Sequence, residues 1–119
     1  MNDAFRMMNT ILYCRRWQET VTFYREALGF PVTFQNDWFV ELKVNTHSRL
    51  SIANEQRATV KSSGGQGLTI TFQVDNADDT RECLQSKGIP LGKIKDHPWG
   101  GRSFFLHDPE GNRLEVWSV

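Results

Sequence analysis

Glu115 stands in the middle of the last apolar stretch of the sequence. Flanking Leu114 and Val116 are suited to burial, and in a strand they point to the face opposite to that of the glutamate. A carboxylate among apolar neighbours needs a ligand or a cation, because an unpaired buried charge is costly. Arg113 and Arg102 are the nearby cations. Glu115 is therefore the first candidate for chemistry, as a ligand-binding group, as a catalytic general base, or as one half of a structural ion pair.

Aromatic residues accompany Glu115. Trp117 lies two positions further on, and a five-residue turn over 108–112 would pair Phe105 with Glu115 and His107 with Arg113. Aromatic walls around a few polar groups are typical of a small-molecule pocket. The neighbourhood of Glu115 therefore favours binding of an organic ligand.

The three histidines supply no obvious metal site. His47 falls in a predicted turn and His97 in a glycine-rich loop, and we expect both to be exposed. His107 lies two residues from the position opposite Glu115, about 6.6 Å of strand rise, which is far for joint coordination without help from another chain. Cys14 and Cys83 are expected to be small buried residues.

The elements that position these residues occur in an order that repeats once. Alternating and helical apolar patterns predict a strand, a helix and three further strands in each half of the chain. A similar Gly-x-Pro exit follows both helices, at Gly29 and Gly88. The predicted strands are 7–14, 30–35, 38–44, 49–54, 68–74, 90–95, 102–107 and 112–118, and the predicted helices are 17–29 and 75–88.

This order predicts an α+β fold of two βαβββ modules that form a cupped mixed sheet. We expect one domain over 1–119, with a first module over about 5–54, a connector over 55–66 and a second module over 67–119. A helix covers only one face of each sheet, so the modules must combine, within the chain or across a dimer, to enclose a core or a cavity.

The sheet face opposite the helix, here called the cup face, carries the candidate ligand-binding residues. Alternation assigns most of them to this face, and Trp99 lies in the loop before the seventh strand. The candidates are Asn9, Tyr13, Phe39, Ser51, Thr69, Thr71, Trp99, Phe105, Glu115 and Trp117.

Composition excludes several classes of function. The 14 basic and 14 acidic residues cancel, which disfavours a nucleic-acid partner. No stretch approaches the roughly twenty apolar residues of a membrane span, and the first residues lack the apolar core of a signal peptide. Two cysteines are too few for a disulfide framework, so we expect a protein of the reducing cytoplasm.

The paired layout, the segment FYREALGF and the final hairpin DPEGNRLEVWS resemble the vicinal oxygen chelate superfamily. That superfamily includes glyoxalase I, extradiol dioxygenases, fosfomycin-resistance enzymes and bleomycin-resistance proteins. The resemblance implies two concave sheets that face each other around a ligand or metal site. It implies metal ligands on the cup face of the first, fourth, fifth and eighth strands, which are Asn9, Ser51, Thr69 and Glu115 here.

Only Glu115 in that set is a typical ligand, because amides and neutral hydroxyls bind first-row divalent ions poorly. The leading hypothesis is a homodimer that binds a small molecule without metal or cofactor, like a bleomycin-resistance protein, with Glu115 attracting a positive group. One alternative is a metal-dependent lyase or dioxygenase in which His107 or His47 of a partner subunit joins Glu115. A metal-free enzyme with Glu115 as base and a non-catalytic interaction module also remain open.

Overall fold

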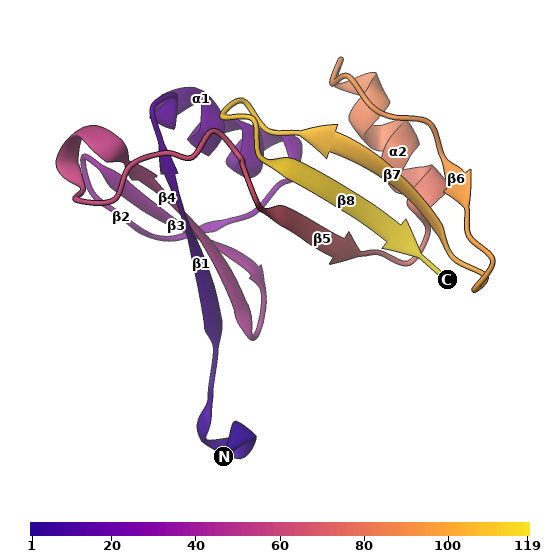
Figure 1. The fold of residues 1–119 in the computed structure, drawn as a ribbon, viewed down its shortest axis with the longest axis horizontal. Helices are drawn as coiled ribbons and strands as arrows, with labels where there is room; N and C mark the ends of the chain where they lie inside the picture. Colours follow the sequence, from indigo (N-terminus) through magenta and orange to yellow (C-terminus); the bar gives the residue numbers. More distant parts are fainter. The chain divides into compact units, whose positions relative to one another are not determined.

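The computed structural model describes residues 1–119 as two units, Met1–Gly64 and Gly65–Val119 (Figure 1). Each unit has a four-stranded mixed sheet, in which the first strand is parallel to the last and the other pairs are antiparallel. The strand orders β1-β4-β3-β2 and β5-β8-β7-β6 are equivalent. The predicted α+β fold of two βαβββ modules is thus confirmed, and the assignment of both modules to one domain stays a prediction.

The elements of the first unit are β1 (Met8–Cys14), α1 (Trp17–Thr22), a π-helix (Phe23–Ala27), β2 (Val32–Gln35), β3 (Phe39–Asn45) and β4 (Ser48–Asn54), with 3-10 turns at Asn2–Ala4 and Glu55–Arg57. Those of the second unit are β5 (Thr69–Gln73), α2 (Ala77–Ser86), β6 (Lys95–Asp96), β7 (Arg102–His107) and β8 (Arg113–Ser118). Neither helix has the length or the apolar run needed to cross a membrane.

Alternation buries one face of each sheet under its helix. The π-helix continues α1 and places Tyr24 in the core, and Gly29, at φ 73°, allows the chain to leave the helical segment. Asn76 caps α2, because its Oδ1 accepts a hydrogen bond from the Asp79 amide at 3.0 Å. The buried core residues on the strands are Leu12, Cys14, Val40, Leu42, Leu50, Ile52 and Ala53 in the first unit and Phe104, Leu106, Leu114 and Val116 in the second.

The strand predicted over 90–95 is wrong, because β6 spans only Lys95–Asp96. The Gly92 amide donates to the Phe105 carbonyl at 2.8 Å, but the Gly92 carbonyl accepts from Arg81 Nε at 2.9 Å. An arginine on α2 thus takes an acceptor that strand pairing would use, and the segment before β6 stays irregular. Cys83 was also expected to be buried and is exposed, while its neighbour Leu84 occupies the buried face of α2.

Arg102 on β7 joins α2 and β6 through two carboxylates. Its Nε and Nη2 each donate to Asp78 at 2.9 Å, and its Nη1 donates to Asp96. The hydrogen bonds from Arg102 lower the pKa of Asp78 below its ordinary value of 3.8. Folding therefore favours ionised Asp78, and this contribution is present above pH 3.8 and lost as the pH falls through the lowered pKa.

We expect Asp78→Asn to be less stable than the unchanged protein at neutral pH, with a difference that begins to shrink below pH 3.8 and disappears as the pH falls through the lowered pKa of Asp78. Urea unfolding at a series of pH values measures this. Asp79→Asn is the matched control, because it removes a charge from the same first turn of α2 without touching Arg102. The same pH profile in both variants would show that the Asp78–Arg102 pair does not carry the effect.

Candidate functional site

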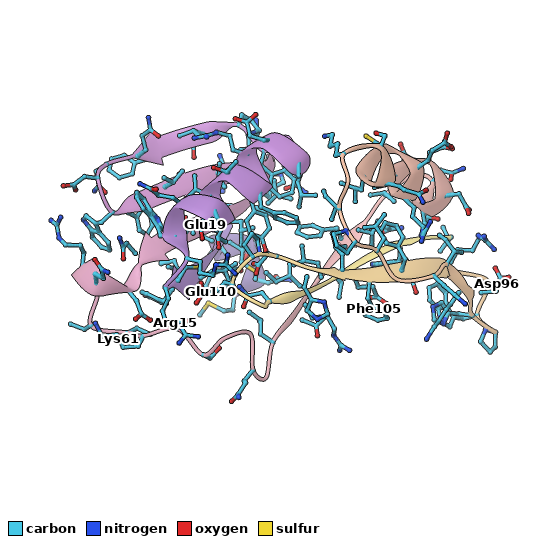
Figure 2. All side chains as sticks on the ribbon, turned by 90° about the horizontal axis from the view of Figure 1, so that it is seen from above. Arg15, Glu19, Lys61, Asp96, Phe105 and Glu110 are labelled. Atoms are coloured by element: carbon cyan, nitrogen blue, oxygen red, sulfur yellow. The ribbon has the colours of Figure 1, made fainter.

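The cup face of the second unit is a grid of three rows across β7, β8 and β5. Glu115 pairs with Phe105 on one side and Thr71 on the other, and the register has the Phe105–Glu115 and His107–Arg113 pairs that the turn length predicts. Figure 2 shows Phe105 on the side of this sheet away from α2. The three rows are Ser103–Trp117–Gln73, Phe105–Glu115–Thr71 and His107–Arg113–Thr69.

The Glu115 side chain is half-buried and forms no hydrogen bond or ion pair within the chain. Both expected cations are engaged elsewhere. Arg113 Nε donates to Thr69 Oγ1 at 2.9 Å, and its guanidinium lies 4.8 Å from the centre of the Phe105 ring. Arg102 binds the acidic residues of α2 and β6. A structural ion pair therefore does not explain Glu115.

Trp99 extends the aromatic wall at one end of this grid. Its ring stacks on His97 at 5.2 Å and meets Trp117 edge to face at 5.8 Å. A Cβ at Gly101 would overlap the Trp99 ring, so a glycine is needed beneath it. Trp99 is nevertheless 59% exposed, so one side of the ring is available to a ligand.

His97 anchors this loop and was wrongly expected to be an exposed loop residue. It is half-buried, and its Nε2 lies 2.6 Å from Ser103 Oγ. Ser103 is fully buried, so its hydroxyl is not available to attack a substrate, and the pair positions Trp99 instead. The sequence pattern did not reveal this contact, because it depends on the β6–β7 pairing. That pairing places Lys95 opposite Ser103 and Asp96 opposite Arg102, directly before His97.

The cup face of the first unit is partly closed by its own hydrogen bonds. Ser51 donates to Asn9 Oδ1 at 2.8 Å, and Thr33 donates to Glu41 Oε1 at 2.8 Å. These contacts occupy polar groups that a metal or ligand would use. Tyr13 and Phe39 are half-buried on the two sides of Ala53, to which both are paired.

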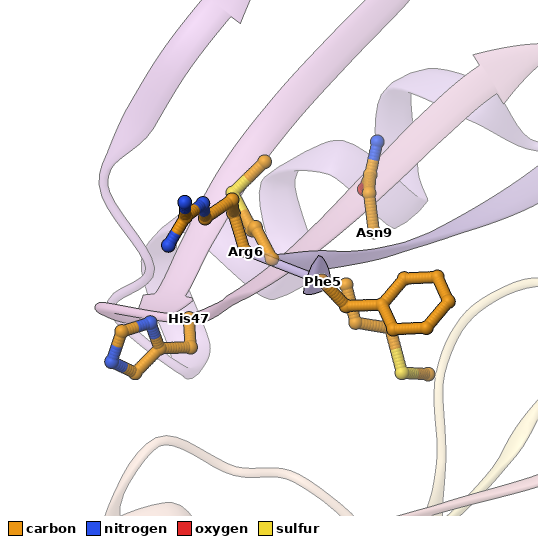
Figure 3. A pocket seen from close by; sticks show the side chains of 6 residues that line it. Phe5, Arg6, Asn9 and His47 are labelled. Carbon is orange, nitrogen blue, oxygen red and sulfur yellow. The ribbon is translucent and has the colours of Figure 1, made fainter. Parts of the chain in front are cut away.

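A hollow of about 730 Å³ lies at the beginning of β1 (Figure 3). His47 reaches it from the turn between β3 and β4, and its exposure there was expected. Asn9 is the only candidate ligand-binding residue in its lining. The lining residues are Phe5, Arg6, Met7, Met8, Asn9 and His47.

The donor groups do not fit a catalytic divalent metal. Neither unit brings together three or more His, Cys, Asp or Glu side chains able to hold an ion. Of the four positions implied by the resemblance, Asn9 and Ser51 bond to each other and Thr69 accepts from Arg113, which leaves Glu115 alone as a strong donor.

The Glyoxalase family model, described as Glyoxalase/Bleomycin resistance protein/Dioxygenase superfamily, matches residues 6–116. The chain belongs to this superfamily. The resemblance noted in its sequence, in the helix exit of the first unit and the DPEGN hairpin, is thereby confirmed.

Solved structures of the glyoxalase superfamily share the fold. A lactoylglutathione lyase from Agrobacterium tumefaciens is 21% identical, with 94% of this chain and 92% of that chain covered at a TM-score of 0.78. A glyoxalase/bleomycin resistance protein/dioxygenase from Nocardioides is 18% identical, with 94% and 82% covered at 0.77. A superfamily member from Sphaerobacter thermophilus is 20% identical, with 95% and 96% covered at 0.77. Comparison with curated proteins gives no significant match.

Proposed function

We propose that this glyoxalase-superfamily protein binds a small organic molecule without a metal, in a sequestration or resistance role. The observation that carries the proposal is the half-buried Glu115 carboxylate, which has no partner in the chain and lies beside Phe105 and near Trp117. A carboxylate in such a place stabilises a positive group on a ligand, since a charge-assisted hydrogen bond gains strength as water is removed.

The chemistry of the surroundings defines the class of ligand. Phe105, Trp117 and the available side of Trp99 offer aromatic surface, which favours a flat ring, and Thr71 beside Glu115 adds a hydroxyl. The ligand proposed is an aromatic compound that carries an ammonium or amidinium group.

The alternatives have less support. A lyase or dioxygenase needs several metal donors, and His107 is paired with Arg113, one row away from Glu115. An interaction module would close its cup face, whereas Thr71 and Gln73 on that face are exposed.

Intrinsic tryptophan fluorescence tests the proposal, because Trp99 and Trp117 border the site. Titration with flat aromatic amines and amidines should give saturable changes, while neutral rings of the same size should bind more weakly. A panel of such cations that leaves the fluorescence unchanged would count against the proposal.

We also propose that the protein acts as a homodimer in the cytoplasm. Its two cysteines are free thiols, which suits a reducing compartment. The beginning of β1, an edge strand, and the segment before it expose apolar side chains that a second copy would cover; Phe5, before β1, is 71% exposed and Met8, in β1, is 69% exposed. Small molecules and a second copy of the chain are the proposed partners, with no role for nucleic acid or membranes.

Met8→Glu is expected to shift the protein from dimer to monomer, because a charge placed in an apolar interface must be desolvated. Sedimentation velocity at several concentrations measures the change. Val60→Glu, at another exposed apolar position outside the strands, is the matched control and should stay dimeric. A Met8→Glu protein that remains dimeric would place the interface elsewhere.

A further inference from the structure

A second hollow, of about 360 Å³, lies at the beginning of β5 and β8 in the second unit. Two of its lining side chains, Arg113 and His107, are basic, and none is acidic. The remaining wall is largely glycine backbone, so the hollow has room for a ligand group next to a guanidinium. Besides Leu68, the lining residues are Gly65, Gly67, Thr69, His107, Gly111 and Arg113.

Arg113 is held in place without being neutralised. Its Nε donates to Thr69 Oγ1 at 2.9 Å, and its guanidinium lies over the Phe105 ring at 4.8 Å. It forms no ion pair with a carboxylate, and the two terminal nitrogens have no partner in the chain. A guanidinium fixed at one nitrogen and open at the others matches the two oxygens of a carboxylate or phosphate.

The glycine wall depends on a close backbone approach. Gly65 has φ 88°, and a Cβ there would lie 2.2 Å from the Gly111 carbonyl oxygen. Gly67, at φ 74°, continues the turn with open space beside it. Contact between Gly65 and Gly111 thus holds the loop before β5 against the β7–β8 turn and forms one side of the hollow.

The Asp108 carboxylate of the β7–β8 turn already has partners within the turn. Asp108 accepts hydrogen bonds from the amides of Glu110 and Asn112 at 3.0 and 2.9 Å and from Asn112 Nδ2 at 2.8 Å. Both of its carboxylate oxygens therefore have partners within the turn. The unpaired carboxylate on the cup face is Glu115, two residues along β8 from Arg113, or about 7 Å of strand rise.

We propose that this hollow is an oxyanion subsite, in which Arg113, assisted by His107, binds a carboxylate or phosphate group of the ligand. The inference rests on the proposed function for the complementary role of Glu115. With Glu115 binding a cation and Arg113 an anion on one strand face, the preferred ligand is zwitterionic, with an aromatic ring between its two charges.

Nitrogen-15 NMR titrations at constant ionic strength test the subsite with three probes: inorganic phosphate, benzylamine and 4-(aminomethyl)benzoate. Phosphate should give saturable shifts at Gly67, His107 and the Arg113 Nε–H, with affinity reduced about tenfold or more in Arg113→Gln. Arg57→Gln, which removes an exposed arginine outside the hollow, should bind phosphate unchanged, and Arg113→Lys should bind with intermediate affinity. The zwitterion should bind more tightly than either singly charged probe.

The probes separate this subsite from the proposed function. Benzylamine that binds while phosphate does not, or phosphate affinity that is equal in Arg113→Gln, would overturn the subsite and leave the role of Glu115 standing. Phosphate that binds through Arg113 while benzylamine fails would support the subsite and overturn the cation-binding role of Glu115.

Discussion

Replacing Glu115 with glutamine is expected to weaken binding of an aromatic ammonium ligand about tenfold or more. The substitution keeps the shape of the side chain and removes its charge, and hydrogen bonds to charged groups contribute about 1.5–3 kcal/mol. Because Glu115 has no partner within the chain, the free protein should fold as before. Tryptophan fluorescence titration of the two proteins measures the difference.

Glu82→Gln is the matched control for this substitution, because Glu82 is exposed on α2 and carries the same charge. It should leave affinity unchanged, which separates a local effect from a change in net charge. Equal loss in both variants, or no loss in Glu115→Gln, would mean that the cation is not bound at Glu115.

Gly65→Ala is expected to destabilise the protein by about 3 kcal/mol, since it adds a backbone overlap to the cost of a positive φ. The new Cβ would lie 2.2 Å from the Gly111 carbonyl oxygen, so either the loop before β5 or the β7–β8 turn must shift. Urea unfolding measures the change.

Gly64→Ala provides the comparison, because Gly64 has a similar φ of 65° with nothing within 4 Å of an added Cβ. It should cost only about 1 kcal/mol, the cost of the left-handed conformation alone. If the two substitutions cost the same, the contact between Gly65 and Gly111 contributes nothing to stability.

Much of the framework of the site could be predicted from local patterns. Period-two alternation identifies which face of β8 carries Glu115, and the length of the DPEGN turn determines that Phe105 pairs with it. The repeated helix exits at Gly29 and Gly88 predict the internal repeat, and both glycines have the positive φ that such an exit requires. These features depend on neighbours in sequence or on a single hairpin.

The features that were missed depend on which hydrogen-bond partner a polar side chain takes. The short β6 follows from the hydrogen bond between Arg81 and Gly92, which no periodic pattern records. No periodic pattern records the hydrogen bond between His97 and Ser103 either. Nor does one record that Arg113 donates to Thr69 instead of pairing with Glu115. Because Arg113 binds Thr69, Glu115 has no partner within the chain, and the proposed function depends on this.

Metal content tests the central claim most directly, since it decides between binding of an organic ligand and metal chemistry. The purified native protein would be measured by elemental analysis, before and after incubation with nickel, zinc, manganese or iron(II) followed by desalting. We predict no retained metal above the level found in Glu115→Ala. Retention near one ion per subunit that disappears in Glu115→Ala would contradict the account and favour a lyase or dioxygenase.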